Sequence, residues 1–484
     1  MATGCAVLWK LPRRVNVVRA RGEFKAIAMA IRELNNAAGS SHSVSRLHPT
    51  VLVATTSRWY PTVRLAMALA NYGCVVEMLC PPAHPIAKTT AATKIHRYHG
   101  LAPLRSFAAA IANAQPDLII PGDDLAARHL HRLYEMERKN GKTNSHISRV
   151  IERSLGPAES FPVAYTRSAF IELALQEGIR VPATKAIANL DELKDWIVGN
   201  GLPVVLKANG TSGGDGVRLA RTLEEAERAF SSLQAPPSLL RAVKRAGIDH
   251  DVTLVGPALL RRRFEMNAQT FIEGREATSQ VACWQGKVLA ALHFEVINKR
   301  SAAGPATVVR LIDNADISSA VERMVRRLKL SGVHGFDFML EEQTGNAYLI
   351  EMNPRATQVG HLALGLGRDI PAALYATLSR QDLQPMRTVT ENDTIALFPQ
   401  EWIRDPNSSF LRSAYHDIPW EEPELVRDCA TNRRKQSSWY SRANWIKSST
   451  PVRTPKPVPA SAKTYGVALD WETTESQQGV IKPQ

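Results

Sequence analysis

The chain has 484 residues, of which 44% are hydrophobic, and this is enough for two or three domains with buried cores. It contains no run of about 18 apolar residues, so the sequence gives no sign of a transmembrane helix or a membrane partner. Its five cysteines are scattered, odd in number and without metal-ligand spacing, which favours a reducing, cytoplasmic setting over a disulfide framework.

The net charge of +14 is concentrated at the two ends of the chain. Residues 1–50 and 431–484 each carry six excess positive charges, so the middle of the chain is nearly neutral. A basic body made to bind nucleic acid would distribute its charge differently, and nucleic acid is therefore not the expected partner. We expect a basic extension at 1–47 and a disordered basic tail at 431–484, where Ser, Thr, Pro and Lys predominate.

An open α/β domain is predicted for residues 48–150. Thr50–Thr56 is a buried strand, Pro61–Ala70 is a helix that begins at a proline and stops before a glycine, and Cys74–Leu79 is the next strand. A further unit ends in PDLIIPGDD, Pro116–Asp124, where a strand is followed by a tight turn and by acids at the start of a helix. The pattern predicts parallel strands joined by helices.

Helices and strands continue through residues 151–380, and the motifs become sparse after that. Helices are predicted within Ser168–Thr184 and at Asp191–Gly201, Thr222–Leu233 and Ile317–Gly332. Strands are predicted at Pro203–Lys207, Gly216–Arg221, Gly335–Leu340 and Asn346–Asn353, and Gln269–Val296 is predicted as a strand pair or meander. In the C-terminal segment 381–430, Thr394–Trp402 is a predicted strand and Pro419–Asp428 begins a predicted helix.

The glycine-rich stretch NGTSGGDGV, Asn209–Val217, lies between two of the predicted strands. A Walker loop needs a lysine after its last glycine, where this chain has Val217, and a dinucleotide fingerprint needs a helix where this chain has a strand. A hairpin that folds over a triphosphate fits better, with Lys207 directing a positive charge at the same phosphates. A plain flexible hairpin is the alternative. The candidate phosphate-binding backbone groups are those of Gly213, Gly214 and Gly216.

A second group of candidate site residues lies in HGFDFMLEEQTGNAYLIEMNPR, His334–Arg355. If the two strands pair about EEQTG, Asp337 lies opposite Glu351, and Glu351 shares a sheet face with Asn353. Three oxygen ligands then converge, which suits Mg²⁺ bound jointly by carboxylates and substrate phosphates. Arg355 follows and could neutralise a transferring phosphoryl group. The alternative is an exposed hairpin with ordinary surface charges.

Three segments in order, PVVLKANGTSGGDGV, FIEGRE and DFMLEEQTGNAYLIEMNPR, resemble the ATP-grasp superfamily. Among its members they resemble the carboxylate–amine ligases and the large chain of carbamoyl-phosphate synthase. The resemblance covers residues 48–380 and implies an α/β protein with an α+β ATP-binding part. The α/β domain would precede a two-subdomain ATP-grasp fold at 151–380, with a lid subdomain at about 185–270.

The resemblance also implies roles for single residues. Lys207 and Arg167 correspond to the basic residues that bind the phosphates of ATP. Phe271 and Ile272 match the linker whose backbone reads adenine, and Glu276 matches the acid that binds the ribose hydroxyls. One departure is Gln269, where many relatives carry an acid, and residues 231–265 match no motif.

Asp337, Glu351 and Asn353 match the ligands of the metal, usually two Mg²⁺ ions for which Mn²⁺ can substitute. Arg355 matches the arginine that steadies an acyl phosphate. The implied reaction is an ATP-dependent ligation of a small carboxylate to an amine through an acyl phosphate, with ADP and phosphate as products, in an enzyme that is often a dimer. The alternatives are a carboxylase, a small-molecule kinase, and a non-catalytic protein that binds a partner through its basic tails.

The contacts to the substrate are less well defined by the sequence. Arg300 or Arg310 could hold the substrate carboxylate, and an ordinary surface loop is an equal alternative. His361 is interpreted as a packed histidine rather than a catalytic one. The turn Ser57–Pro61 follows the first strand at the edge of the sheet where ligands bind, although its aromatic residues are more typical of packing.

Overall fold

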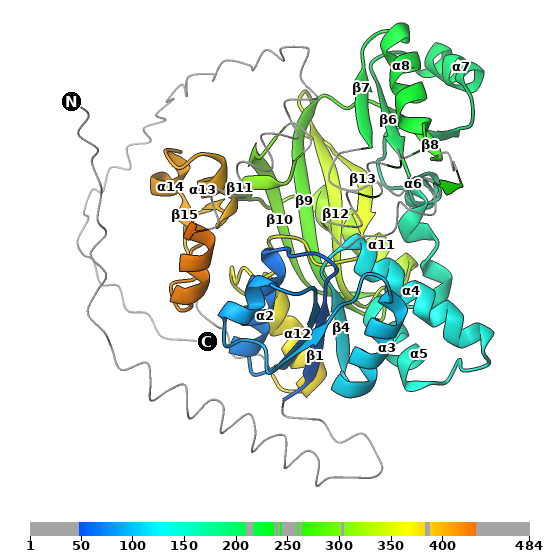
Figure 1. Cartoon of the computed structure of the whole chain (residues 1–484). Coiled ribbons are helices and arrows are strands. Elements are labelled where there is room, and N and C mark those ends of the chain that lie inside the picture. The colour runs from blue at the N-terminus through cyan, green and yellow to red at the C-terminus, as the bar shows by residue number, and fades with distance from the viewer. Residues whose placement is uncertain are drawn as a thin grey trace, which may run out of the picture. The chain divides into compact units, whose positions relative to one another are not determined.

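Figure 1 shows the computed structural model of the chain, from which the following description is taken. The structure describes residues 48–209, 216–236, 239, 243, 259–260, 264–301, 304–382 and 388–431. The predicted basic extension 1–47, nearly all of the predicted tail, and two candidate glycines, Gly213 and Gly214, lie outside these residues.

A parallel sheet with the strand order β3-β2-β1-β4 forms the N-terminal part. Its strands are β1 (Thr50–Ala54), β2 (Val75–Cys80), β3 (Lys94–Arg97) and β4 (Leu118–Pro121). Its helices are α2 (Pro61–Asn71), the 3-10 turn η1 (Pro85–Lys88), α3 (Pro103–Ala114), α4 (Asp124–Lys139) and α5 (His146–Leu155). Strand β1 is buried at all five positions because helices cover both faces of the sheet, which explains its continuously apolar sequence.

A seven-stranded sheet, in the order β13-β12-β9-β10-β11-β14-β15, lies at the centre of the molecule (Figure 1). Its strands are β9 (Gly274–Trp284), β10 (Lys287–Lys299), β11 (Ala306–Leu311), β12 (Gly332–Glu341), β13 (Ala347–Asn353), β14 (Thr394–Ala396) and β15 (Tyr415–His416). All neighbours are antiparallel except β14 and β15. The predicted pairing of two strands about EEQTG is confirmed by β12 and β13.

Helices pack on both faces of this sheet. On one face α6 (Arg167–Gln176) and α11 (Ala315–Arg327) bury Phe170 and Met324 against Phe336. On the other face α12 (Ile370–Ser379) and helix α2 share a continuous apolar core with the sheet, so the parallel sheet and the seven-stranded sheet are joined by packing. Two short 3-10 turns, η2 (Ala158–Ser160) and η3 (Val163–Tyr165), precede α6.

A third, antiparallel sheet has the strand order β5-β8-β6-β7 and carries two helices (Figure 1, green). Its elements are β5 (Thr184–Ile187), α7 (Leu190–Asn200), β6 (Val204–Ala208), β7 (Val217–Ala220), α8 (Leu223–Gln234) and β8 (Met266–Thr270). The predicted Thr222 cap of α8 is confirmed, since its hydroxyl accepts a hydrogen bond from the Glu225 amide. The predicted fold class, an α/β part with a parallel sheet followed by an α+β part with antiparallel sheets, is thereby confirmed.

The strand pair predicted within Gln269–Val296 is confirmed by β9 and β10, whereas the first two residues of that stretch belong to β8 of the third sheet. One sequence prediction needs correction. The predicted strand Thr394–Trp402 ends at Ala396, and residues Gln400–Arg404 form helix α13 instead. Alternating side chains alone do not reveal which sheet a strand joins.

The C-terminal segment packs back onto the N-terminal part. After α13 come α14 (Phe410–Ser413), β15 and a helical stretch at 423–431, where a helix was predicted. The Glu422 carboxylate accepts hydrogen bonds of 2.8 Å from both the amide and the hydroxyl of Thr90. Across the described parts of the chain, none of the helices has the length and apolar character that a membrane span requires.

Candidate active site

The predicted oxygen ligands meet on the hairpin of β12 and β13. Asp337 is directly opposite Glu351 in the register of the two strands, and Gly335 is opposite Asn353. The Asn353 side-chain amide donates a hydrogen bond of 2.8 Å to Asp337 Oδ2, and the Thr278 hydroxyl of β9 donates one of 2.9 Å to Oδ1. The three predicted ligands therefore share one sheet face, on which Asp337 and Asn353 are hydrogen-bonded to each other.

Two basic residues from different elements approach this cluster. Arg167, the first residue of α6, donates from Nε and Nη2 to Glu351 Oε2 at 3.1 and 2.9 Å. Its Nη1 also donates to the Ala208 carbonyl at the end of β6, at 3.1 Å. Lys207 precedes Ala208 in the same strand and is only 6% exposed. Arg167 thus bridges the third sheet and the central hairpin.

The charges of the cluster perturb one another. Burial alone would raise the pKa of Glu351, but the positive charges of Arg167 and Lys207 outweigh it and hold the pKa below its usual range. Burial and the neighbouring charge of Glu351 raise the pKa of Asp337. Burial lowers the pKa of Lys207 to about 8, although the nearby carboxylates oppose this effect. The two carboxylates repel each other, which is the condition that a bound divalent cation relieves.

The residues fit a metal that is shared with a substrate. Among the described residues there is no group of three His, Cys, Asp or Glu side chains placed to hold an ion. The cluster offers two carboxylates, Asp337 and Glu351, and the side-chain oxygen of Asn353. Mg²⁺ accepts such a set because it prefers oxygen ligands and takes its remaining ligands from water and phosphate oxygens.

Arg355 connects the cluster to the parallel sheet. Its Nε donates to Asp124 Oδ1 at 2.8 Å, and its Nη2 donates to Asn353 Oδ1 at 3.2 Å. Asp124 is the first residue of α4, and the adjacent Ala356 amide donates to the Pro121 carbonyl of β4 at 2.9 Å. The carboxyl end of β4 therefore lies directly beside the end of the β12–β13 hairpin.

A second acid at this edge has a structural role. Asp123 caps α4 by accepting from the Ala126 amide at 2.8 Å, and it also accepts from Thr55 Oγ1 and the Thr56 amide, both at 2.6 Å. It thereby fixes the start of the turn Ser57–Pro61 after β1. Within that turn Tyr60 is 9% exposed and packs edge-on against Phe398, which agrees with the packing interpretation of its aromatic residues.

The predicted adenine and ribose residues lie in the segment that joins β8 to β9. Phe271 and Ile272 are half-buried, and the Phe271 amide donates to the Pro203 carbonyl. Glu276 is exposed in β9 and forms an ion pair of 2.5 Å with Lys299. Gln269 is 3% exposed and donates to the Thr184 hydroxyl of β5 at 2.9 Å. None of these contacts tests the nucleotide role, which stays a prediction.

Of the remaining predicted residues, the structure separates the two arginines. Across the strands of the central sheet, Arg310 is paired with Glu295 and lies in line with Phe338, which is the neighbour of Asp337 in β12. Because neighbouring positions of a strand face opposite ways, Arg310 lies on the sheet face opposite Asp337, and its contact with the substrate stays a prediction. Arg300 is half-buried and directly follows Lys299, the partner of Glu276. Gly216 closes the hairpin by accepting from the Ala208 amide at 2.8 Å.

Comparisons with known proteins agree with this geometry. A protein-family model described as an ATP-grasp domain matches residues 173–359. The chain contains an ATP-grasp domain. The match includes Lys207, the metal hairpin and Arg355, whereas Arg167 lies six residues before it.

Individual relatives cover only part of the chain. The carbamoyl phosphate synthase large chain of Methanosarcina acetivorans is 23% identical over 207 residues, which are 43% of this chain and 18% of that protein. The large chain from Thermotoga neapolitana is 22% identical over 279 residues, or 54% of this chain and 23% of that protein. The chain therefore spans less than a quarter of the length of these relatives.

A solved structure has a similar fold over a larger part of the chain than the ATP-grasp match. The ADP complex of N5-carboxyaminoimidazole ribonucleotide synthetase matches with a TM-score of 0.50 at 15% identity. The match covers 70% of this chain and 80% of that chain. It therefore extends beyond the ATP-grasp match itself.

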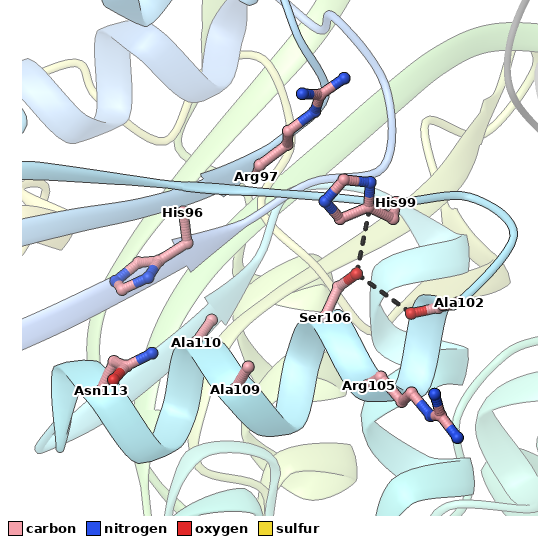
Figure 2. A pocket seen from close by; sticks show the side chains of 9 residues that line it. All are labelled: His96, Arg97, His99, Ala102, Arg105, Ser106, Ala109, Ala110 and Asn113. Atoms are coloured by element: carbon pink, nitrogen blue, oxygen red, sulfur yellow. Dashed lines mark hydrogen bonds between the residues drawn. The ribbon is translucent and has the colours of Figure 1, made fainter.

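Two further features lie outside the ATP-grasp cluster. His361 is buried and its Nε2 lies 2.6 Å from Asp417 Oδ2, which agrees with its interpretation as a packed histidine. A cavity of about 320 Å³ lies between β3 and α3 of the parallel sheet. Figure 2 shows its lining, in which Ser106 accepts from the His99 amide and donates to the Ala102 carbonyl. None of the predicted site residues lines this cavity.

Sequence reasoning missed Asp124 as the partner of Arg355. The signal was present, since the turn PGDD was recognised as an acidic start of a helix at the carboxyl end of a strand. What the sequence lacked was the contact between that turn and a residue more than two hundred positions away.

Proposed function

We propose that the protein is an ATP-dependent ligase that joins a small carboxylate to an amine. The observation that carries the proposal is the cluster of Asp337, Glu351 and Asn353, with Arg167, Lys207 and Arg355 within the same network. This arrangement gathers oxygen ligands for metal ions and positive charges for phosphates at one place. The match of residues 173–359 to the ATP-grasp domain supports the same reading.

In this proposal Lys207 and Arg167 bind the phosphates of ATP, and the hairpin glycines contribute backbone amides. Gly216 is the one of the three candidate glycines that lies within the described residues. Phe271 and Ile272 contact the adenine, and Glu276 binds the ribose, for which Lys299 must release its carboxylate. Arginine and lysine suit phosphate because their donors form charge-assisted hydrogen bonds.

Asp337, Glu351 and Asn353 would hold Mg²⁺, in two sites as in the family it resembles, and Mn²⁺ would replace it. The metal would supply neutralisation of charge on the phosphate oxygens. Arg167 would orient Glu351 toward it through the two hydrogen bonds described above. Thr278 would orient Asp337 in the same way, through its hydroxyl.

The proposed reaction has two steps. A carboxylate oxygen of the substrate attacks the γ-phosphorus of ATP, and the bond from this phosphorus to the bridging oxygen breaks. The products of this step are ADP and an acyl phosphate. The amine then attacks the carbonyl carbon, loses a proton and displaces inorganic phosphate. Arg355, beside the metal hairpin, neutralises the acyl phosphate, and the chain acts by positioning and charge rather than by covalent chemistry.

The test measures ADP and phosphate release with ATP, Mg²⁺ and pairs drawn from amino acids and small carboxylic acids. Release that needs both members of a pair, and that is lost in Glu351→Gln, is the expected result. Glu342→Gln, an exposed change in the turn of the same hairpin, is the matched control and should retain full activity. Release of ADP without any amine and without inorganic phosphate would contradict the ligase and favour a kinase.

Isotopically labelled oxygen distinguishes the acyl phosphate from its alternatives. If the carboxylate oxygens of the substrate carry the label, one labelled atom must appear in the released phosphate. Phosphate without label would contradict an acyl phosphate. The size of the protein by light scattering tests the dimer that the resemblance implies.

A further inference from the structure

An arginine beside the proposed active site, Arg128, forms no ion pair with any residue that the structure describes. Arg128 lies on α4, and its guanidinium group is over the ring of Tyr165, 5.1 Å from the ring centroid. The Nε of Arg128 and the hydroxyl of Tyr165 are both buried, and neither has a hydrogen-bond partner among the described residues. Leaving such donors unsatisfied is costly, so their arrangement points to a ligand.

The other arginines near the hairpin are each paired with a carboxylate. Arg167 is paired with Glu351, and Arg355 is paired with Asp124. Asp124 is the acid nearest to Arg128 along α4, one helical turn away, but Arg355 already holds its carboxylate. Among the described residues, no carboxylate therefore forms an ion pair with Arg128.

Arg128 and Tyr165 are connected to the proposed active site at both ends. Asp124, one turn before Arg128 on the same helix face, contacts Arg355 at the exit of the metal hairpin. Tyr165 lies two residues before Arg167, which contacts Glu351 on that hairpin. An anion bound between Arg128 and Tyr165 would consequently lie at the border of the metal cluster and the parallel sheet.

The pair lies among charges of both signs, since the positive charges of Arg128 and Arg132 and the negative charge of Asp124 all act on the Tyr165 hydroxyl. Burial, with a further effect of His334, lowers the pKa of the adjacent His131 to about 3, so this ring is neutral at physiological pH. The ring stacks on Phe161 and lies 5.2 Å from Tyr165, and it therefore supports the aromatic ring without adding charge. Burial raises the pKa of Tyr165, which keeps its hydroxyl protonated and able to donate.

We propose that Arg128 and Tyr165 bind an oxyanion, a carboxylate or a phosphate, of the molecule on which the site acts. One oxygen accepts from the guanidinium group and another from the Tyr165 hydroxyl. The inference rests on the proposed function, because it makes this oxyanion a second acidic group of the substrate, separate from the carboxylate that reacts. It narrows the substrate to a molecule with two acidic groups, and it assigns recognition to the N-terminal α/β part.

The test is a calorimetric titration of the full chain with succinate, L-glutamate, L-aspartate and inorganic phosphate at millimolar concentrations. Each titration is carried out with and without Mg²⁺ and a non-hydrolysable ATP analogue. At least one anion should bind to the wild type, and Arg128→Gln should weaken its binding by about 10- to 100-fold, as expected for a lost charge-assisted hydrogen bond. Tyr165→Phe should weaken it by about 3- to 10-fold.

Arg138→Gln is the matched control, because it removes the same charge from an exposed position in the last turn of the same helix. It should leave anion binding unchanged. If Arg128→Gln weakens the binding of the dicarboxylates, the site binds a carboxylate. If it weakens the binding of inorganic phosphate, the site binds a phosphate. Unfolding temperatures of both variants close to that of the wild type would show that each variant is folded.

Two results would overturn the inference. One is anion binding by Arg128→Gln that equals binding by the wild type, and the other is a wild type that binds none of the four anions. Failure of the proposed function is recognised separately, by loss of binding of the ATP analogue itself. Arg128-dependent anion binding in a protein that binds no nucleotide would reject the ligase and keep the oxyanion site.

Discussion

Replacing Lys207 by methionine should weaken nucleotide binding and at the same time stabilise the nucleotide-free protein. Lys207 is 6% exposed, and burial lowers its pKa from 10.5 to about 8. Since one pKa unit corresponds to about 1.4 kcal/mol, keeping this lysine charged destabilises the folded protein by roughly 3 kcal/mol at neutral pH. The cost is full below pH 8 and disappears as the pH rises to 10.5, because the lysine is then neutral in both states.

Methionine has a similar length and no charge, so Lys207→Met removes most of this cost. For a protein of this size, an increase of roughly 3 kcal/mol in the free energy of unfolding corresponds to an increase of several degrees in the unfolding temperature. The same change removes a charged donor to the phosphates. A charge-assisted hydrogen bond is worth about 1.5–3 kcal/mol, so the Kd for nucleotide should rise by about 10- to 100-fold.

The assay combines thermal unfolding without nucleotide and fluorescence titration with a labelled ADP in the presence of Mg²⁺. Lys185→Met is the matched control, because Lys185 lies in β5 of the same sheet and is exposed. It should change neither quantity. A Lys207→Met protein that binds nucleotide as tightly as the wild type would refute the phosphate role. A lower unfolding temperature would refute the reasoning from buried charge.

Four further predictions concern stability and metal. Asp417→Asn should destabilise the fold by about 3–5 kcal/mol, because it leaves Arg64 and His361 buried without their shared carboxylate; chemical denaturation measures this. Burial would raise the pKa of Asp417, but His361 and Arg64 outweigh it and lower the pKa. The contribution of Asp417 to the stability of the fold is therefore full above about pH 4 and is lost as the pH falls further. Acid unfolding of the wild type compared with Asp417→Asn checks this. Gly122→Ala should cost about 1–3 kcal/mol in the same denaturation assay, because its Cβ would lie 2.4 Å from Thr62 Cγ2. Chelation of Mg²⁺ should weaken nucleotide binding, as measured by the same titration, and added Mn²⁺ should restore it.

Each of these has a control that could contradict it. Glu421→Gln is the control for Asp417, because Glu421 also contacts Arg64 but is exposed, and equal destabilisation by both would contradict the role of burial. An acid-unfolding midpoint that is the same in both proteins would contradict the pH prediction. A Gly122→Ala protein of unchanged stability would show that Thr62 moves aside. Nucleotide binding that is insensitive to chelation would contradict the metal site.

The local register of the site could be predicted from the sequence, because it depends on short-range pairing. Asp337 and Glu351 flank a turn of known residues, so counting along the hairpin brings them nearly opposite each other, and a register shift beside Asp337 makes them directly opposite. The same holds for Lys207 and Val217, which are paired across the hairpin that contains the glycines. Patterns of buried residues also gave the helices their correct places, as at α2 and α8.

Contacts between distant segments could not be predicted in this way. The strand that contains Arg310 was recognisable from its sequence, but its face depends on the pairing with β10, whose register is set by irregularities near Val296. The partner of Arg355 depends on how the parallel sheet docks on the central sheet, which the shared apolar core decides. Propensity and periodicity describe a segment by itself and carry no information on such docking.

The contact of Arg355 with Asp124 has a consequence for recombination between related enzymes. A chimera that places a foreign N-terminal domain on this ATP-grasp body inherits Arg355 but not necessarily an acid at the start of α4. Without that acid the arginine faces the junction with no counter-charge, even if both halves are native in themselves. A crossover near residue 150 should therefore yield active hybrids only from parents that share this acid, so the two halves are expected to have diverged together rather than as exchangeable modules.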